Sequence, residues 1–359
     1  MTRGLWRAPL VLCAAASLVW GVWLGLLRIG WALPLPKPDQ LILHGPLMVG
    51  GFLGTLIGLE RAIGVARPWA YAAPIASGAG ALVLVLGPQG HPAGPILITT
   101  ASLIVCAVFA TVVRRHATAP AVTMLVASGA WIAGNTLWAG GIAIYRIVFW
   151  WIAFLVLTIA GERLELNRML RPGKWALAAF AASVALVMTG AAATAAYPAV
   201  GVRMLGAGLV LLTLWLAAND VARRTVRHPG VTRYIAVCML SAYAWLGVAG
   251  AVAIVSGVFE SGFAHDALLH AVFLGFAITM VFGHAPIVFP AITGRPIPFT
   301  PVFYAPYALL QASVLVRVCG DLVDDFAQYR AWGGLLNALA LILFAATVVS
   351  SNLRRAARA

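Results

Sequence analysis

The chain alternates between long apolar stretches and short segments that contain most of its Arg, Lys and Pro residues. A helix needs roughly 20 apolar residues to cross the hydrocarbon core of a bilayer, and about twelve of these stretches approach that length. The pattern predicts an all-α, polytopic membrane protein that forms a single integral membrane domain over residues 1–359. The expected spans are 8–28, 42–62, 69–88, 95–113, 119–140, 142–161, 175–195, 200–219, 233–257, 264–285, 301–318 and 331–351.

Composition supports a membrane environment. Hydrophobic residues make up 62% of the chain and charged residues only 9%, which leaves a soluble domain too little polar surface. Arg3 and Arg7 precede a first apolar run that continues for about 20 residues with no convincing small-x-small cleavage site, so we expect an uncleaved helix rather than a signal peptide. The four cysteines lie singly in or beside different spans, without the spacing of a disulfide framework or a zinc site.

The positive charges follow the expected topology. Of the 24 Lys and Arg residues, 18 lie at the N-terminus, after even-numbered spans or at the C-terminus. The other 6 lie on the opposite side: Arg28, Lys37, Arg146, Arg203, Arg317 and Arg330. The positive-inside rule therefore predicts cytoplasmic termini in a multi-pass protein of the cell inner membrane. The net charge of +14 then indicates orientation in the lipid bilayer, and no nucleic-acid partner is expected.

Two sequence features near the inner face have alternative explanations. The pairs Glu60-Arg61 and Glu162-Arg163 close two spans, as snorkelling charges do at an interface. Alternatively, residues 58–64 are a degenerate form of the loop motif of sugar-type transporters. The glycines at 50, 54 and 58 favour close helix packing, although they would also leave room for a flat cofactor.

Histidines are the main candidates for function, because ionisable groups inside a bilayer are costly. Three of the seven fall in loops between the expected spans: His91, His116 and His228. The other four lie in the second and tenth expected spans: His44, His265, His270 and His284.

His44 and His270 are expected at similar depth. Both spans start at the outer face, and a rise of about 1.5 Å per residue places His44 roughly 3 Å and His270 roughly 9 Å inside its helix. Two imidazoles at similar depth on different helices can bind one haem iron from opposite sides. The spacing thus makes both histidines candidate axial ligands, with unrelated interfacial or packing histidines as the alternative.

His284 is a third metal-ligand candidate. It lies roughly 40° from the helix face of His270 and about 21 Å deeper. The matching position of the second span is Gly58, so a second bis-histidine haem is not expected. We expect His284 to meet Glu60 or Arg61 near the inner surface, and His265 to lie at the outer interface.

Residues that follow His270 resemble a known family. The tenth span leads into Thr293-Gly294-Arg295-Pro296, and the next span ends in Leu315-Val316-Arg317-Val318. A helix that begins with histidine and leads into Thr-Gly-Arg-Pro, followed by a helix that ends in Leu-Arg-Val, is similar to the C-terminal part of the NnrS family. Members of that family are twelve-helix membrane proteins with haem and copper, are linked to nitric oxide metabolism, and distantly resemble the main subunit of haem-copper oxidases.

The resemblance implies a haem b held by His44 and His270, with Arg317 facing a haem propionate. A guanidinium suits that role because it can donate two hydrogen bonds to one carboxylate, although a snorkelling helix end is the alternative for Arg317. The implied role is binding, sensing or electron transfer in the handling of nitric oxide, with a periplasmic electron-transfer partner. No catalytic residue is assigned.

Departures from the family pattern argue against copper. Family members carry His-x-His-Glu at the start of the second helix, whereas residues 42–45 are Ile-Leu-His-Gly. The sixth and seventh spans, which supply copper ligands in the oxidases, contain no histidine. A copper site needs several converging imidazoles, so copper is doubtful.

Two other functional classes are considered. A secondary transporter of a small solute is favoured by the helix count and by an expected break of the tenth helix at Pro286–Gly294, because interrupted helices often line transport sites. A cofactor-free scaffold is favoured by the acidic loop 321–325, which could dock a basic partner such as a cytochrome, unless that loop is merely solvated.

Overall fold

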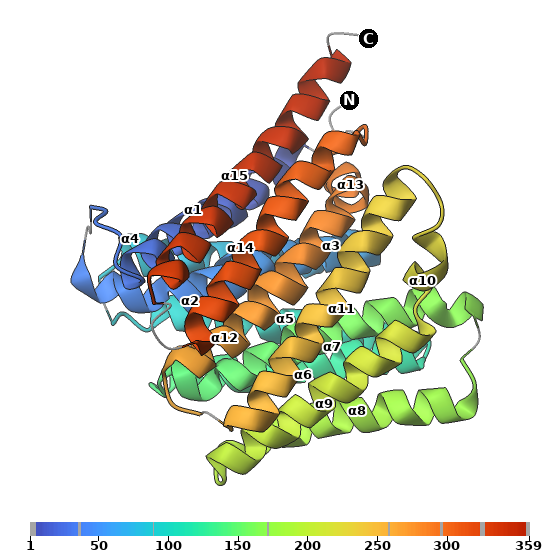
Figure 1. The fold of residues 1–359 in the computed structure, drawn as a ribbon, viewed down its shortest axis with the longest axis horizontal. Helices are drawn as coiled ribbons and strands as arrows, with labels where there is room; N and C mark the ends of the chain where they lie inside the picture. Colours follow the sequence, from blue (N-terminus) through green and yellow to red (C-terminus); the bar gives the residue numbers. More distant parts are fainter. Residues whose placement is uncertain are drawn as a thin grey trace. The chain divides into compact units, whose positions relative to one another are not determined.

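The computed structural model describes residues 5–34, 37–88, 90–170, 172–257, 259–294, 297–323 and 327–356. Within these ranges the fold is all-α, which confirms the predicted class (Figure 1). Eleven helices of the described ranges are long and apolar enough to cross a membrane. The expected span 119–140 is present as α6 (Ala119–Ala139) but is not among the eleven, and it carries buried Thr123, Ser128 and Asn135. The sidedness of the termini stays a prediction.

The chain divides into two compact units, which are described separately. The N-terminal unit comprises Met1–Phe154 and Ile292–Gly294, and the C-terminal unit comprises Leu155–Ala291 and Arg295–Ala359. The division falls inside the helix α7 (Ile144–Leu166). A single membrane domain over the whole chain stays a prediction.

The N-terminal unit is built from successive antiparallel spans. Its helices are α1 (Ala8–Arg28), α2 (His44–Pro46), α3 (Thr55–Val65), α4 (Ala72–Leu86), α5 (Ala93–Arg115), α6 and the first half of α7. Helix α5 packs against both α4 and α6, and α1 packs on the second span.

The second span departs from regular α-helix. A 3-10 turn (Pro38–Leu43) leads into α2, and a π-helical segment, η3 (Leu47–Gly54), separates α2 from α3. A π-helix shifts backbone hydrogen bonding to the i→i+5 pattern and is often found at functional sites. Ser77 of α4 supports the segment by donating a hydrogen bond of 2.7 Å to the Gly50 carbonyl.

Glycines of this span serve helix packing. A Cβ atom at Gly51 would lie 2.7 Å from Ser17 Oγ, and one at Gly54 would lie 2.7 Å from the Trp131 ring. These positions are filled by neighbouring helices, as small-residue packing requires. Packing is therefore the correct explanation of this glycine pattern, and room for a flat cofactor at these positions is wrong.

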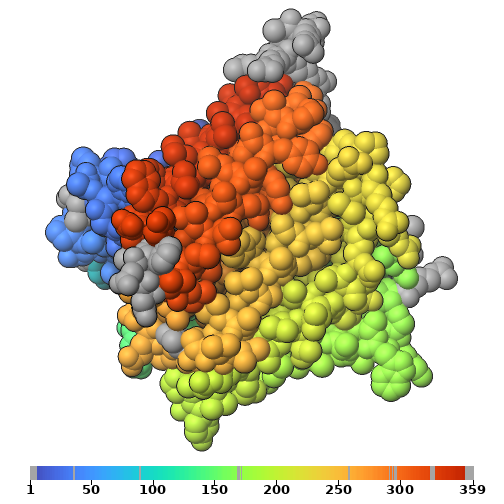
Figure 2. Space-filling view, in the orientation of Figure 1, coloured from blue at the N-terminus to red at the C-terminus, as the bar shows by residue number. Residues whose placement is uncertain are grey.

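The C-terminal unit also consists of long helices in close contact. They are the end of α7, α8 (Lys174–Ala193), α9 (Pro198–Asn219), α10 (Ala222–Thr225), α11 (Val231–Ser256), α12 (Phe263–His270), α13 (Thr279–Thr293), α14 (Tyr304–Leu322) and α15 (Ala327–Ala356). Figure 2 shows the side chains of α11, α14 and α15 as ridges on one face of this unit. Their exposed side chains include Leu315, Trp332 and Ile342, which suit contact with lipid.

The tenth span continues further than predicted. The expected break at Pro286–Gly294 is wrong, because helix α13 runs through Pro286 and Pro290 to Thr293. Intramembrane helices tolerate proline where surrounding groups satisfy the backbone. Arg295 and Pro296, which belong to the family-like motif, lie outside the described residues.

The tenth span leaves α-geometry earlier instead, at a second π-helical segment, η6 (Ala271–Ile278). A series of side-chain hydrogen bonds supports this segment. Thr279 Oγ1 donates to the Leu274 carbonyl at 3.3 Å, Gln311 Nε2 donates to Thr279 Oγ1 at 3.0 Å, and Trp245 Nε1 donates to Gln311 Oε1 at 2.8 Å. Helices α11 and α14 thereby hold η6 through polar contacts.

Candidate functional site

His44 is the first residue of α2 and lies three residues before the π-helical segment η3. Its Nδ1 lies 2.7 Å from the Gly21 carbonyl of α1. The ring also approaches Gly25, where a Cβ atom would lie 2.9 Å from His44 Cε1. The two glycines of α1 therefore let a half-buried imidazole lie directly against the neighbouring backbone.

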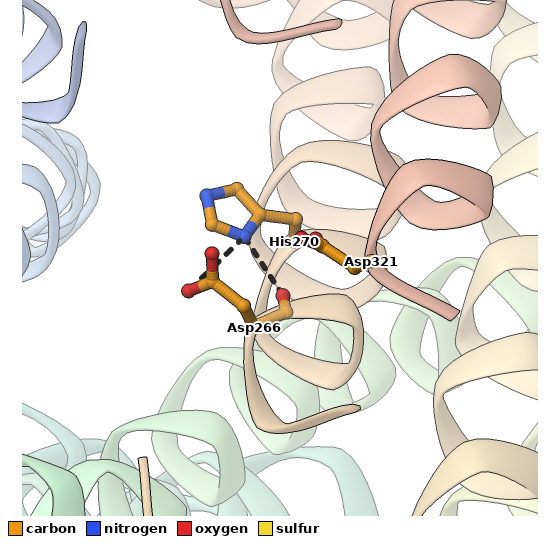
Figure 3. Close-up of side chains that lie close together, drawn as sticks. All are labelled: Asp266, His270 and Asp321. Atoms are coloured by element: carbon orange, nitrogen blue, oxygen red, sulfur yellow. Dashed lines mark hydrogen bonds and ion pairs between the residues drawn. The ribbon is translucent and has the colours of Figure 1, made fainter. Parts of the chain in front are cut away.

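His270 has a corresponding place in the tenth span. It is the last residue of α12 and is followed at once by η6. Its Nδ1 lies 2.8 Å from the carbonyl of Asp266, one turn earlier, and 3.9 Å from the Asp266 carboxylate (Figure 3). His284 repeats the local contact, with Nδ1 at 2.8 Å from the Met280 carbonyl.

These contacts define the tautomer of each neutral ring. A carbonyl oxygen only accepts hydrogen bonds, so Nδ1 of His44, His270 and His284 is the donor. The lone pair of the neutral imidazole is then on Nε2, the nitrogen that binds metal when Nδ1–H is held by a carbonyl or carboxylate. In this tautomer each neutral ring presents Nε2 as its metal-binding nitrogen.

The predicted site residues are divided between the two units. His44 belongs to the N-terminal unit, whereas His270, His284 and Arg317 belong to the C-terminal unit. The joint ligation of one iron by His44 and His270 stays a prediction, as does the contact of His284 with Glu60 or Arg61. His265 is buried in α12, and its expected position at the outer interface stays a prediction.

Within the C-terminal unit, His270 lies beside a cluster of ion pairs, here named the outer ion cluster and formed by Asp266, Arg317, Asp321 and Arg330. Arg317 binds Asp266, and its Nε lies 3.1 Å from Asp321. Arg330 lies 3.0 Å from Asp266 and 2.9 Å from Asp321. Arg317 is only 3% exposed, so the snorkelling alternative for this residue is wrong.

Three acidic and histidine side chains of this region are close enough to hold a cation. Ligand atoms of Asp266, His270 and Asp321 all lie within 4.8 Å of one another. However, both carboxylates are already paired with two guanidinium groups, which a cation would have to displace. We therefore assign no separate cation site to the outer ion cluster.

A second buried cluster, the Asp220 cluster, consists of Arg163, Asn167, Asp220 and Tyr243. Arg163 forms a two-pronged pair with Asp220, at 2.8 Å and 2.9 Å. Asn167 and Tyr243 donate to the same carboxylate at 3.3 Å and 2.8 Å. The Arg163 side chain is 3% exposed, so the prediction that Arg163 snorkels at the helix end is wrong.

The electrostatics of Asp220 reflect two opposing effects. Burial alone would raise the pKa of this carboxyl, but the hydrogen bonds and positive charge of Arg163, together with the Ala222 N–H, hold the pKa below its usual value. Asp220 is therefore ionised and links the start of α10 to Arg163 near the end of α7 and to Tyr243 in the middle of α11. By contrast, the Glu60–Arg61 pair at 3.1 Å keeps partly exposed side chains, as expected at an interface.

Sequence reasoning missed most members of both clusters. The predicted outer ends of successive spans carry both acidic and basic residues: Asp266, Arg317, Asp321 and Arg330. Opposite charges at equal predicted depth could therefore have indicated the ion pairs. Asp220 is the only acidic residue beside the basic stretch 221–233. The remainder of the acidic loop proposed as a docking site, Asp324 and Asp325, lies outside the described residues.

Long apolar helices with ionic groups buried at their ends define a multi-pass α-helical membrane protein. The family model that matches this sequence is a domain of unknown function, DUF8744, which covers residues 7–353. The chain belongs to this family. No curated protein and no solved structure matches it, so the similarity to the NnrS family stays a prediction.

Proposed function

We propose that this membrane protein binds a b-type haem, with His44 and His270 as its axial ligands. The main support is the shared local structure of the two histidines. Each Nδ1 is hydrogen-bonded to a backbone carbonyl, which directs the lone pair to Nε2. Iron of a low-spin haem takes two such neutral imidazoles.

The two π-helical segments add to this support. In the second span η3 begins three residues after His44, and in the tenth span η6 begins immediately after His270. π-Helical turns are uncommon and concentrate at functional sites. Their occurrence next to both candidate ligands, each held by side chains from neighbouring helices, favours a function for these two positions.

Arg317 remains the candidate for a propionate partner. It already binds Asp266, Asp321 and the Arg330 carbonyl, but a guanidinium carries five N–H groups and can serve a further carboxylate. Arg330 adds a second cation to the outer ion cluster. The two guanidinium groups balance the charges of Asp266 and Asp321, so a propionate would bind through the remaining N–H groups of Arg317.

The biological role proposed for the haem is nitric oxide handling or electron transfer, on the basis of the NnrS resemblance. A secondary transporter is the alternative, and substrate-dependent uptake into liposomes by haem-free protein would favour it. The expected helix break that supported transport is absent from the described part of α13, which continues to Thr293. The haem proposal is therefore preferred.

Absorption spectra of the purified protein test the ligand assignment. We expect low-spin b-type bands in the wild type and their loss in His44→Ala and in His270→Ala. His91→Ala, in an exposed loop, is the matched control and should keep the bands. Unchanged bands in either ligand variant, with elution as a folded protein on size exclusion, would refute the assignment.

A further inference from the structure

The segment between α9 and α11 is a strongly basic surface, here named the α10 surface and comprising residues 221–233. Its arginines are exposed: Arg223, Arg224, Arg227 and Arg233. His228 is exposed as well, and the segment contains no Asp or Glu. The adjacent Asp220 is buried and bound by Arg163, so it does not neutralise these exposed charges.

The α10 surface is held in a defined conformation. The Ala222 N–H donates to Asp220 Oδ1 at 2.7 Å, and the Val221 N–H donates to Asn167 Oδ1 at 3.0 Å. At its other end, Arg233 Nε donates to the Val226 carbonyl at 3.2 Å. A surface fixed at both ends loses less conformational entropy on binding than a flexible loop does.

Two candidate membrane spans flank the α10 surface. Helix α9 ends at Asn219 and α11 begins at Val231, and both are candidate membrane spans. Figure 1 shows α10 beside the corresponding ends of these two helices. The arginines are therefore expected at the level of lipid phosphates, where basic residues next to membrane helices attract anionic headgroups.

We propose that the α10 surface binds the phosphate group of an anionic glycerophospholipid. Guanidinium groups suit phosphate because they donate two parallel hydrogen bonds with charge assistance. Orientation by the positive-inside rule explains why the segment is basic, but it does not require a fixed conformation. This proposal is independent of haem binding.

The test compares lipid retention by the full-length protein in detergent, measured by native mass spectrometry. Phosphatidylglycerol and phosphatidylcholine are offered separately, and inorganic phosphate is added as a third arm. We expect preferential retention of phosphatidylglycerol and a loss of about fivefold in affinity for each of Arg224→Gln and Arg227→Gln. Both side chains are exposed, so these variants should fold normally.

Arg203→Gln is the matched control, because Arg203 is an exposed arginine of the same unit on the predicted opposite side. It should retain phosphatidylglycerol like the wild type. Equal retention of the two lipids, equal losses in Arg203→Gln, or no loss in the α10 variants would overturn the proposal. Displacement of the lipid by inorganic phosphate at the same concentration would overturn the assignment to a lipid rather than to free phosphate.

Discussion

Replacing Arg163 with methionine removes the main partner of a carboxylate whose side chain is fully buried. Among the described residues, Asp220 then keeps the donors Asn167, Tyr243 and the Ala222 N–H. Leaving one member of a buried ion pair without its partner costs about 3–5 kcal/mol. A loss of this size should lower the unfolding midpoint by on the order of 10 °C.

The double variant Arg163→Met/Asp220→Asn separates charge from packing. Asparagine can still accept from the Ala222 N–H through Oδ1, and its NH2 group can donate to the Tyr243 hydroxyl oxygen. No buried charge remains, so the double variant should be more stable than Arg163→Met alone. Thermal unfolding followed by the fluorescence of the 13 tryptophans measures this at a fixed scan rate. Arg203→Met, at an exposed site, should change the midpoint little.

The pH dependence of the contribution of Asp220 to stability should have opposite signs in the wild type and in Arg163→Met. Because the folded-state pKa of Asp220 is lowered, its stabilising contribution is present above about pH 4, the usual pKa range of Asp, and is lost as pH falls through the folded pKa. In Arg163→Met, uncompensated burial raises that pKa, so acidification should relieve the destabilisation at first. A midpoint unaffected by Arg163→Met, or a larger deficit at acidic pH, would refute this account of the Asp220 cluster.

Two further predictions concern packing and the tenth span. Gly190→Ala should strongly destabilise the protein, because its Cβ would lie 2.7 Å from Leu205 Cα. Gly129→Ala is the control and should be nearly neutral, because the space around Gly129 is open. Equal thermal unfolding midpoints for the two variants would contradict the close packing of α8 on α9. Gln311→Leu leaves the Trp245 N–H without its acceptor, which should reduce stability by about 1–3 kcal/mol. Amide hydrogen exchange of residues 271–278 should then accelerate. Unchanged exchange would show that the Gln311 side chain does not hold η6.

The extent of the membrane helices could be predicted from the sequence because span length follows from bilayer thickness. The first expected span matches α1 (Ala8–Arg28), and the boundaries of most others agree closely. The π-helical segments could not be predicted, because η3 and η6 are as apolar as an ordinary helix and depend on supporting groups such as Ser77 and Gln311. Hydrophobic pattern alone does not distinguish these hydrogen-bonding arrangements.

Buried charges were the weakest part of the sequence interpretation. Arg163 and Arg317 were each expected, on one alternative, to reach the interface from a helix end, but both find carboxylates inside the protein. The partner Asp220 is 57 residues from Arg163 along the chain, so only tertiary structure pairs them. The contacts of His44 and His270 with carbonyls likewise depend on side-chain conformation, which residue spacing does not determine.

The haem content of the purified wild-type protein tests the central proposal most directly. A pyridine haemochrome assay combined with iron analysis should find protohaem and iron in equal amounts and in constant ratio to the chain. Folded protein that contains neither haem nor iron, after expression in cells supplied with haem precursor, would contradict the proposed function and leave the helical membrane fold without this cofactor.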